Sequence, residues 1–165
     1  MKALLQRVSS ARVTVAGPHQ PRRVGQIGVG LLVFLAVERD DGLQDIRYVA
    51  SKVCELRVFE DPAQPERRMT RSVVEIGGDV LVVSQFTLAA DCRRGRRPSF
   101  DRAASPDVAR PAYDAVVQAI SGAGVRVATG EFQASMQVEL VNDGPVTFWI
   151  RVPGPGEGPR PIGVS

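Results

Sequence analysis

The segment VELVNDGPVTFWI, residues 138–150, places a Gly144-Pro145 step inside a run that otherwise alternates like a β-strand. Proline cannot donate to a sheet ladder, so it is confined to sheet edges, bulges and turns. One interpretation is a tight turn between two strands, 138–141 and 146–150. The other is a functional segment, because an X-Pro bond is the only common place for a cis peptide bond. Taken alone, the segment is compatible with both.

A second segment, Ser84-Gln85-Phe86-Thr87, directly follows the strand-like run 80–83. Like Asn142 to Thr147, it offers small side chains, hydroxyls and backbone groups where a strand ends, and few strong acids or bases. The two segments together favour a functional site over a simple turn.

The rest of the chain predicts an α+β fold with a mostly antiparallel sheet or open β-barrel and two main helices. Apolar residues recur at three- and four-residue steps over 42–57, which indicates an amphipathic helix with Asp40 or Asp41 as its cap. A second helix starts at Ser105-Pro106 or near Pro111 and ends at Gly122. Strands are expected at 3–8, 12–15, 24–27, 31–37, 80–83, 125–128, 136–141 and 146–151.

These elements predict a single domain over residues 1–151, followed by a Pro/Gly-rich tail at 152–165 that we expect to be disordered. The 165 residues are 44% hydrophobic and 24% charged, the balance of a soluble globular protein. The longest apolar run, Val29 to Val37, is too short to span a membrane, and no secretory signal is visible. Cys54 and Cys92 fall in different environments, which suits a reducing cytosol. We therefore expect a cytoplasmic protein.

The composition excludes several kinds of chemistry. His19 is the only histidine, so a Ser-His-Asp or Cys-His arrangement would have to be built on a loop residue that looks exposed. No spacing fits a zinc site, a phosphate-binding P-loop or a dinucleotide-binding loop. The sequence therefore predicts no metal and no organic cofactor, and an enzyme would work through positioning, backbone donors and hydroxyls.

The run Arg93-Arg94-Gly95-Arg96-Arg97 concentrates four guanidinium groups in five residues just after the Ser84 segment. Arginine binds phosphate bidentately, so the run is a candidate phosphate-binding loop. The alternative is a solvated loop, which charge runs usually are.

The chain resembles the D-aminoacyl-tRNA deacylases of the type with paired Ser-Gln-Phe-Thr and Asn-x-Gly-Pro-Val/Phe-Thr signatures. The resemblance extends from Met1 to about Arg151, and five motifs occur in order at the family's spacing. They are Gln6-Arg7-Val8, Leu56-Arg57-Val58-Phe59, Ser84-Gln85-Phe86-Thr87-Leu88, Gly95-Arg96-Arg97-Pro98-Ser99-Phe100 and Val141-Asn142-Asp143-Gly144-Pro145-Val146-Thr147.

What the resemblance implies is a homodimer with an active site at the subunit interface. Ser84 to Thr87 of one subunit would form the pocket floor, and a cis Gly144-Pro145 bond of the other would reach into it. Its two carbonyl oxygens would exclude the side chain of an L-amino acid and accept a D-residue or glycine. The implied reaction is hydrolysis of the ester between a D-aminoacyl group, or glycine mischarged on tRNA(Ala), and the tRNA's terminal ribose.

The resemblance also implies roles for single residues. Ser84, Gln85, Phe86 and Thr87 would make the catalytic site, in which the ribose 2′-hydroxyl assists and a backbone N–H of Phe86 or Thr87 holds the carbonyl oxygen. Thr87 is compatible with a nucleophile or with a wall residue of the pocket, and the absence of a nearby base favours the wall residue. Four residues would bind the terminal adenosine and the tRNA: Phe132, Met136, Arg96 and Arg97. Three others would support the site: Arg7, Asn142 and Thr147.

Two alternatives stay open at this point. Phe86, Phe132 and Met136 are also compatible with plain core positions. The whole chain is also compatible with a nucleic-acid-binding dimer that keeps the fold and the basic loop without catalysis.

Overall fold

The computed structural model describes residues 1–17, 20–64, 66 and 68–152. Over these residues it contains six strands, two α-helices and one short 3-10 helix. The strands are β1 (Lys2–Val15), β2 (Arg22–Ile27), β3 (Gly30–Ala36), β4 (Asp79–Ser84), β5 (Arg126–Thr129) and β6 (Met136–Arg151). The helices are α1 (Leu43–Glu55) and α2 (Pro106–Gly122), and the 3-10 helix η1 is Phe86–Ala89.

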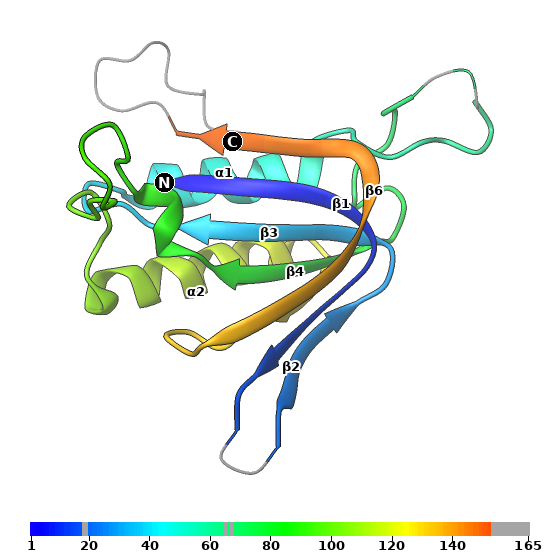
Figure 1. Cartoon of the computed structure of the whole chain (residues 1–165). Helices are drawn as coiled ribbons and strands as arrows, with labels where there is room; N and C mark the ends of the chain where they lie inside the picture. Colours follow the sequence, from blue (N-terminus) through cyan, green and yellow to red (C-terminus); the bar gives the residue numbers. More distant parts are fainter. Residues whose placement is uncertain (18–19, 65, 67, 153–165) are drawn as a thin grey trace.

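The sheet has the order β2-β1-β3-β4-β5, with β6 paired to β1. Strand β1 is antiparallel to β2, β3 and β6, whereas the pairs β3–β4 and β4–β5 are parallel. Parallel neighbours need a long crossover, and here α1 follows β3 and α2 follows β4. Both helices lie against the same face of the sheet (Figure 1). The expected α+β class with two main helices is confirmed, with a mixed sheet.

The sheet curls into a nearly closed barrel, which brings β2 against β5. A Cβ built on Gly25 of β2 would lie 2.5 Å from the Thr129 carbonyl oxygen at the end of β5. Only glycine permits this approach of one backbone to another. The curl divides the core into two clusters, one between the helices and the sheet and one inside the curl.

The cap of α1 differs from the expectation, whereas the start of α2 at Ser105-Pro106 is confirmed over a start near Pro111. The N-cap of α1 is Gly42, whose N–H donates to the Asp45 side chain, because Asp41 instead pairs with the Met1 amino group. Helix α2 runs unbroken from Pro106 through Pro111. Pro111 is exposed, so the carbonyl that loses its partner there can be hydrated.

Strand β6 is continuous where the first interpretation of its sequence expected two strands joined by a tight turn. Asn142 pairs with Val8 and Thr147 with Gln6, so four residues of β6 stand opposite one residue of β1. The extra residues, 143–146, bulge from the ladder at the point where β6 bends (Figure 1). The strand then returns along the other half of β1.

The first residue beyond the predicted domain 1–151 is Val152. Val152 is only 9% exposed, and its N–H donates to the Met1 carbonyl, so it packs with the core. The rest of the predicted tail, 153–165, and His19 lie outside the described residues. Among the described residues, no helix is both long and apolar enough to cross a membrane.

Candidate functional site at two ends of the sheet

The Ser84 segment closes the carboxyl end of β4. Ser84 pairs with Leu35 of β3, and the Gln85 N–H donates to the Leu35 carbonyl over 2.8 Å. The chain then turns into η1, and within the described residues the backbone N–H groups of Phe86 and Thr87 have no acceptor. This is the ordinary state of the first N–H groups of a helix, and it leaves two donors at the strand end.

The side chains here are polar but hold no base. The Gln85 Nε2 donates to the Thr87 hydroxyl, and among the described residues no charged group contacts that hydroxyl. The Phe86 ring is 56% exposed and lies 5.1 Å, centroid to centroid, from the Phe100 ring. Phe86 is therefore not a core residue.

Phe132 and Met136 flank the same end of β4. The Phe132 ring packs 6.0 Å from the Tyr113 ring and lies under the Arg110 guanidinium at 5.4 Å. Met136 packs on Gly130, whose N–H donates to the Val82 carbonyl. Both side chains are half-buried at the rims of the two core clusters, so each is partly core and partly accessible.

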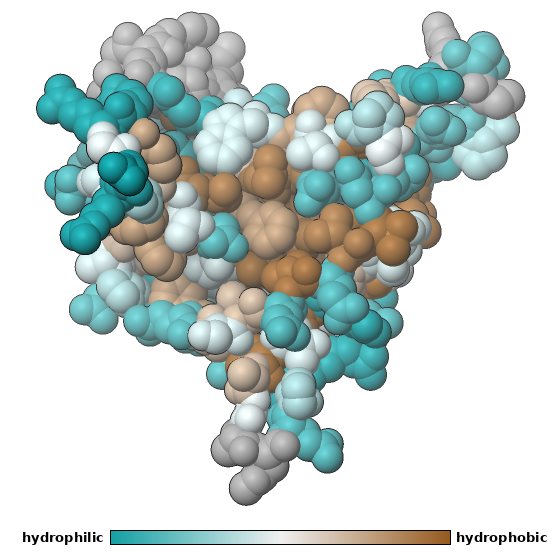
Figure 2. Space-filling model, viewed as in Figure 1, coloured by the Kyte–Doolittle hydropathy of each residue, from teal (hydrophilic) through white to brown (hydrophobic). Residues whose placement is uncertain are grey.

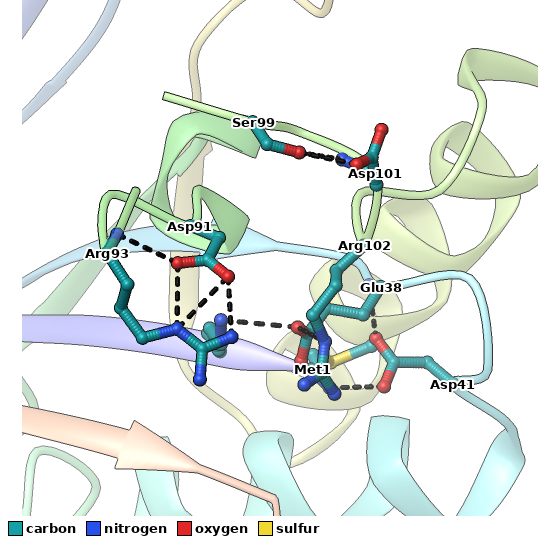
Figure 3. Close-up of polar contacts among 9 residues, drawn as sticks. Met1, Glu38, Asp41, Asp91, Arg93, Ser99, Asp101 and Arg102 are labelled. Carbon is teal, nitrogen blue, oxygen red and sulfur yellow. Dashed lines mark hydrogen bonds and ion pairs between the residues drawn. The ribbon is translucent and has the colours of Figure 1, made fainter. Parts of the chain in front are cut away.

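The basic run lies in a small hairpin beside η1. Asp91 and Ser99 exchange both backbone hydrogen bonds, at 2.8 and 2.9 Å, and close its base. The Arg93 side chain donates to both Asp91 carboxylate oxygens (Figure 3), which holds the pKa of that carboxyl well below its usual range. Arg96 and Arg97 are exposed at the tip.

Arg7 supports the Gly144-Pro145 segment. This side chain is 6% exposed, and its Nη1 donates to the Val58 carbonyl over 2.6 Å. Its Nε lies 2.9 Å from Asp143 Oδ2, an ion pair that lacks the direction of a hydrogen bond. Arg7 thus contacts the residue directly before Gly144 through the Asp143 carboxylate.

Asn142 anchors both sides of the bulge. Its Nδ2 donates to the Arg7 carbonyl at 2.8 Å and to the Val146 carbonyl at 3.3 Å. The Thr147 hydroxyl donates to Asn142 Oδ1 at 3.5 Å and accepts from Gln6. Between these anchors the peptide bond from Gly144 to Pro145 is cis, and both residues are exposed.

In one chain the two segments lie at opposite ends of the sheet. Ser84 is level with Leu35 of β3, and Arg7 is level with Leu31. Four residues along a strand amount to about 13 Å, and β1 and β4 lie on opposite sides of β3. Figure 1 shows the carboxyl end of β4 and the bend of β6 at opposite ends of the sheet. One chain therefore holds two separate halves of the expected site.

Comparison with known proteins bears on the identity of these segments. The family model described as D-Tyr-tRNA(Tyr) deacylase matches residues 4–151. This chain belongs to that family. The family and the enzyme class expected from the motifs are thereby confirmed.

Similar members of the deacylase family come from several bacteria. The D-aminoacyl-tRNA deacylase of Syntrophotalea carbinolica is 57% identical over 150 residues, which cover 91% of this chain and 96% of that protein. The protein of the same description from Heliobacterium modesticaldum is 54% identical, covering 91% and 95%.

Two solved structures are similar to the deacylase fold seen here. One, described as c-Myc DNA Unwinding Element Binding Protein, has a TM-score of 0.84 at 34% identity and covers 93% of this chain and 100% of its own. A probable eukaryotic D-amino acid tRNA deacylase has a TM-score of 0.75 at 20% identity, covering 90% and 97%, and supports the fold alone.

The sequence did not single out three residues of this deacylase that contact and stabilise the Ser84 and Gly144 segments. Asp143 pairs with Arg7, Phe100 packs on Phe86, and the Tyr113 hydroxyl donates to the Val82 carbonyl over 2.9 Å. Asp143 and Phe100 lie inside recognised motifs, so their positions carried a signal. Tyr113 looks like any apolar helix residue in the sequence.

Proposed function

We propose that this protein hydrolyses the ester of D-aminoacyl-tRNAs, and of glycyl-tRNA mischarged on tRNA(Ala), in the cytoplasm, and rejects L-aminoacyl-tRNA. The observation that carries the proposal is the exposed Gly144-Pro145 bulge, anchored by Arg7 and Asn142, in a chain of the deacylase family.

The proposed active site lies between two copies of the chain. The separation of the Ser84 and Gly144 segments within one chain supports this, because a second copy turned about a two-fold axis can bring one half to the other. An apolar surface also supports a partner. Leu4 pairs with Phe34 and with Trp149, so these side chains share the sheet face away from the helices, where Trp149 is 50% exposed. Figure 2 shows a broad apolar area on that face.

The proposed chemistry needs no strong base. The N–H groups of Phe86 and Thr87, which have no acceptor within the described part of the chain, are suited to holding the ester carbonyl oxygen as it gains charge. The ribose 2′-hydroxyl of the substrate assists the attack of water on the ester. The Thr87 hydroxyl, which accepts a hydrogen bond from Gln85, forms part of the pocket wall. An aminoacyl ester is intrinsically labile, so positioning supplies a large part of the required rate.

In this proposal the backbone of Gly144 and Pro145 selects the handedness of the amino acid. The carbonyl oxygens of Gly144 and Pro145 occupy the volume that an L-side chain would need, and they accept the substrate amino group. Because no side-chain pocket is involved, D-residues of different size are accepted alike.

The terminal adenosine is assigned to Phe132 and Met136, and the tRNA backbone to Arg96 and Arg97. The half-buried positions of the first two and the exposed positions of the arginines support this division. Ser84 and Gln85 complete the pocket floor, and Arg7, Asn142 and Thr147 support the selecting segment.

The test is hydrolysis of D-tyrosyl-tRNA and L-tyrosyl-tRNA by the pure full-length protein with a chelator present. We expect loss of the D-ester only. We also expect Pro145→Ala to lower the rate far more than Thr87→Ala, since the proposed selecting carbonyls flank Pro145. Equal survival of both esters would contradict the proposal.

A second candidate is a nucleic-acid-binding protein without catalysis. It is favoured by the similarity to the solved DNA-unwinding-element-binding protein and by the basic hairpin. Equal survival of both esters, with tRNA retained on a filter, would support it.

A further inference from the structure

We infer that the basic hairpin contacts the tRNA phosphate backbone through Arg94, Arg96 and Arg97 only, and that Arg93 and Arg102 act as internal supports of the hairpin. The inference rests on the proposed function and deepens it, since it adds Arg94 to the tRNA contacts and removes two neighbouring arginines from them.

The hairpin has a defined shape that presents its tip. The paired backbones of Asp91 and Ser99 close its base, and Gly95 turns the tip at φ +69°, a conformation that favours glycine. The Ser99 hydroxyl donates to Asp101 Oδ2 over 2.6 Å and stiffens the returning strand. The arginines therefore extend from a loop whose conformation is fixed by hydrogen bonds.

Two of the five arginines between 93 and 102 are already neutralised. The Arg93 Nε lies 2.9 Å from Asp91 Oδ1, and its backbone N–H donates to the same atom over 3.0 Å. The Arg102 Nε lies 3.3 Å from Glu38 Oε1, and the same carboxylate also pairs with Lys2 through Oε1 and with the Met1 amino group through Oε2 (Figure 3). Moving Arg93 to a phosphate would leave the Asp91 carboxylate unpaired, and moving Arg102 would take away one of the three cations around Glu38.

The other three guanidinium groups have no such partner. Arg94, Arg96 and Arg97 are exposed, and over the described part of the chain none of them makes an ion pair or a hydrogen bond. Their full positive charge is available to a polyanion, and each can take one phosphate.

A competing position for the phosphate is the depression of about 570 Å³ beside the hairpin. Its lining includes Arg93 and Arg94 but also the carboxylates of Asp91 and Asp101. Two carboxylates repel a phosphate, so the depression is a poor site for one. The phosphates therefore follow the outer tip.

The hairpin is also fixed relative to the proposed reaction site. Asp91 follows η1 after one residue, and Phe100 packs on Phe86. An ester held at Phe86 and Thr87 thus has the last phosphates of its tRNA within reach of the tip. A tRNA acceptor end, with a phosphate at every nucleotide, fits this arrangement.

The experiment measures binding of uncharged tRNA to the full-length protein over a range of KCl concentrations. Three single variants are measured: Arg94→Gln, Arg96→Gln and Arg97→Gln. Each should make the slope of log K against log [KCl] less steep by about 0.7–0.9. If variant and wild type are compared relative to their binding in 1 M salt, the variant should bind about sixfold more weakly at 0.1 M salt. In D-tyrosyl-tRNA hydrolysis the same variants should raise KM and leave kcat unchanged.

Two controls separate contact from net charge. Arg57→Gln removes the same charge at the far end of α1, where Arg57 is exposed. The double variant Asp91→Asn/Arg93→Gln removes the internal pair without changing net charge. Both should keep the wild-type slope.

Several results would overturn the inference. One is a slope that falls as much in either control as in the three variants. Another is an unchanged slope in the triple variant Arg94→Gln/Arg96→Gln/Arg97→Gln. If the wild type hydrolyses the D-ester while the triple variant keeps its slope, only this inference fails. If the slope falls but no ester is hydrolysed, the phosphate assignment stands and the proposed function fails.

Discussion

Arg7 and Asp143 form an ion pair of 2.9 Å across the bulge of β6, with Arg7 buried and Asp143 55% exposed. The pair joins the central strand β1 to the segment that carries Gly144 and Pro145. Because Arg7 also donates to Val58, its guanidinium connects the bulge to the loop after α1.

Arg7→Ala should therefore lower the free energy of unfolding by about 2–3 kcal/mol, because the Val58 carbonyl and the Asp143 carboxylate both lose a partner. Urea unfolding measures the loss. The control is Arg12→Ala on the same strand, whose pair with Glu139 is exposed and should contribute much less to the free energy of unfolding. Equal losses in the two variants would contradict a structural role for Arg7.

Among the described residues no base contacts the Thr87 hydroxyl, so Thr87→Ala should keep D-tyrosyl-tRNA hydrolysis within about tenfold of the wild type. Single-turnover hydrolysis is the measurement, with Thr87→Ser as the matched variant that keeps the hydroxyl. A wholly inactive Thr87→Ala beside an active Thr87→Ser would show that the hydroxyl is required for the reaction and would count against assistance by the ribose.

Tyr113 donates a buried hydrogen bond to the Val82 carbonyl, two residues before Ser84. Tyr113→Phe keeps the ring but removes one of the two donors to that carbonyl, which still accepts from the Gly130 N–H, so the expected cost in the free energy of unfolding is about 1 kcal/mol. Tyr48→Phe, at a partly exposed tyrosine on α1, should cost much less. Burial also raises the pKa of Tyr113 well above its usual value, so its tyrosinate absorbance should appear only when the protein unfolds.

Glu38 makes the stability of the fold depend on pH. Burial by itself would raise the pKa of Glu38, but Lys2, the N-terminal amine and Arg102 outweigh it and lower that pKa. A carboxyl whose pKa is lowered by folding stabilises the protein above its unfolded pKa of about 4.3, and this contribution is lost as pH falls through the folded value.

The expected result is that Glu38→Gln lowers Tm by about 4 °C at pH 7 and that this difference shrinks below about pH 4. Thermal melts at several pH values test it, with Glu55→Gln on the exposed end of α1 as the control. A difference in Tm that stays constant with pH would contradict the assignment.

The two cysteines should differ in reactivity. Burial raises the pKa of Cys54 to about 11, with a smaller contribution from Glu55, whereas Cys92 is exposed at the base of the hairpin. At pH 8 a disulfide reagent should therefore titrate one thiol in the native protein and two in denaturant. Cys92→Ser should abolish the native reaction, and a persistent native reaction in that variant would show that Cys54 is accessible.

The sequence by itself determined the elements and the residues of the two segments. Hydrophobic periodicity is local, so the apolar stripes of α1 and α2 and the run of β4 were readable from neighbouring residues. The signatures around Thr87 and Pro145 were likewise visible as short motifs, and they led to the family.

Only the tertiary structure decided how these parts meet. The bulge of β6 depends on its register against β1, which no local pattern specifies when four residues oppose one. The cap at Gly42 depends on Asp41 being drawn to the Met1 amine, a contact across forty residues. The placement of Ser84 and Gly144 at opposite ends of the sheet follows from strand order, which is a long-range property of the whole chain.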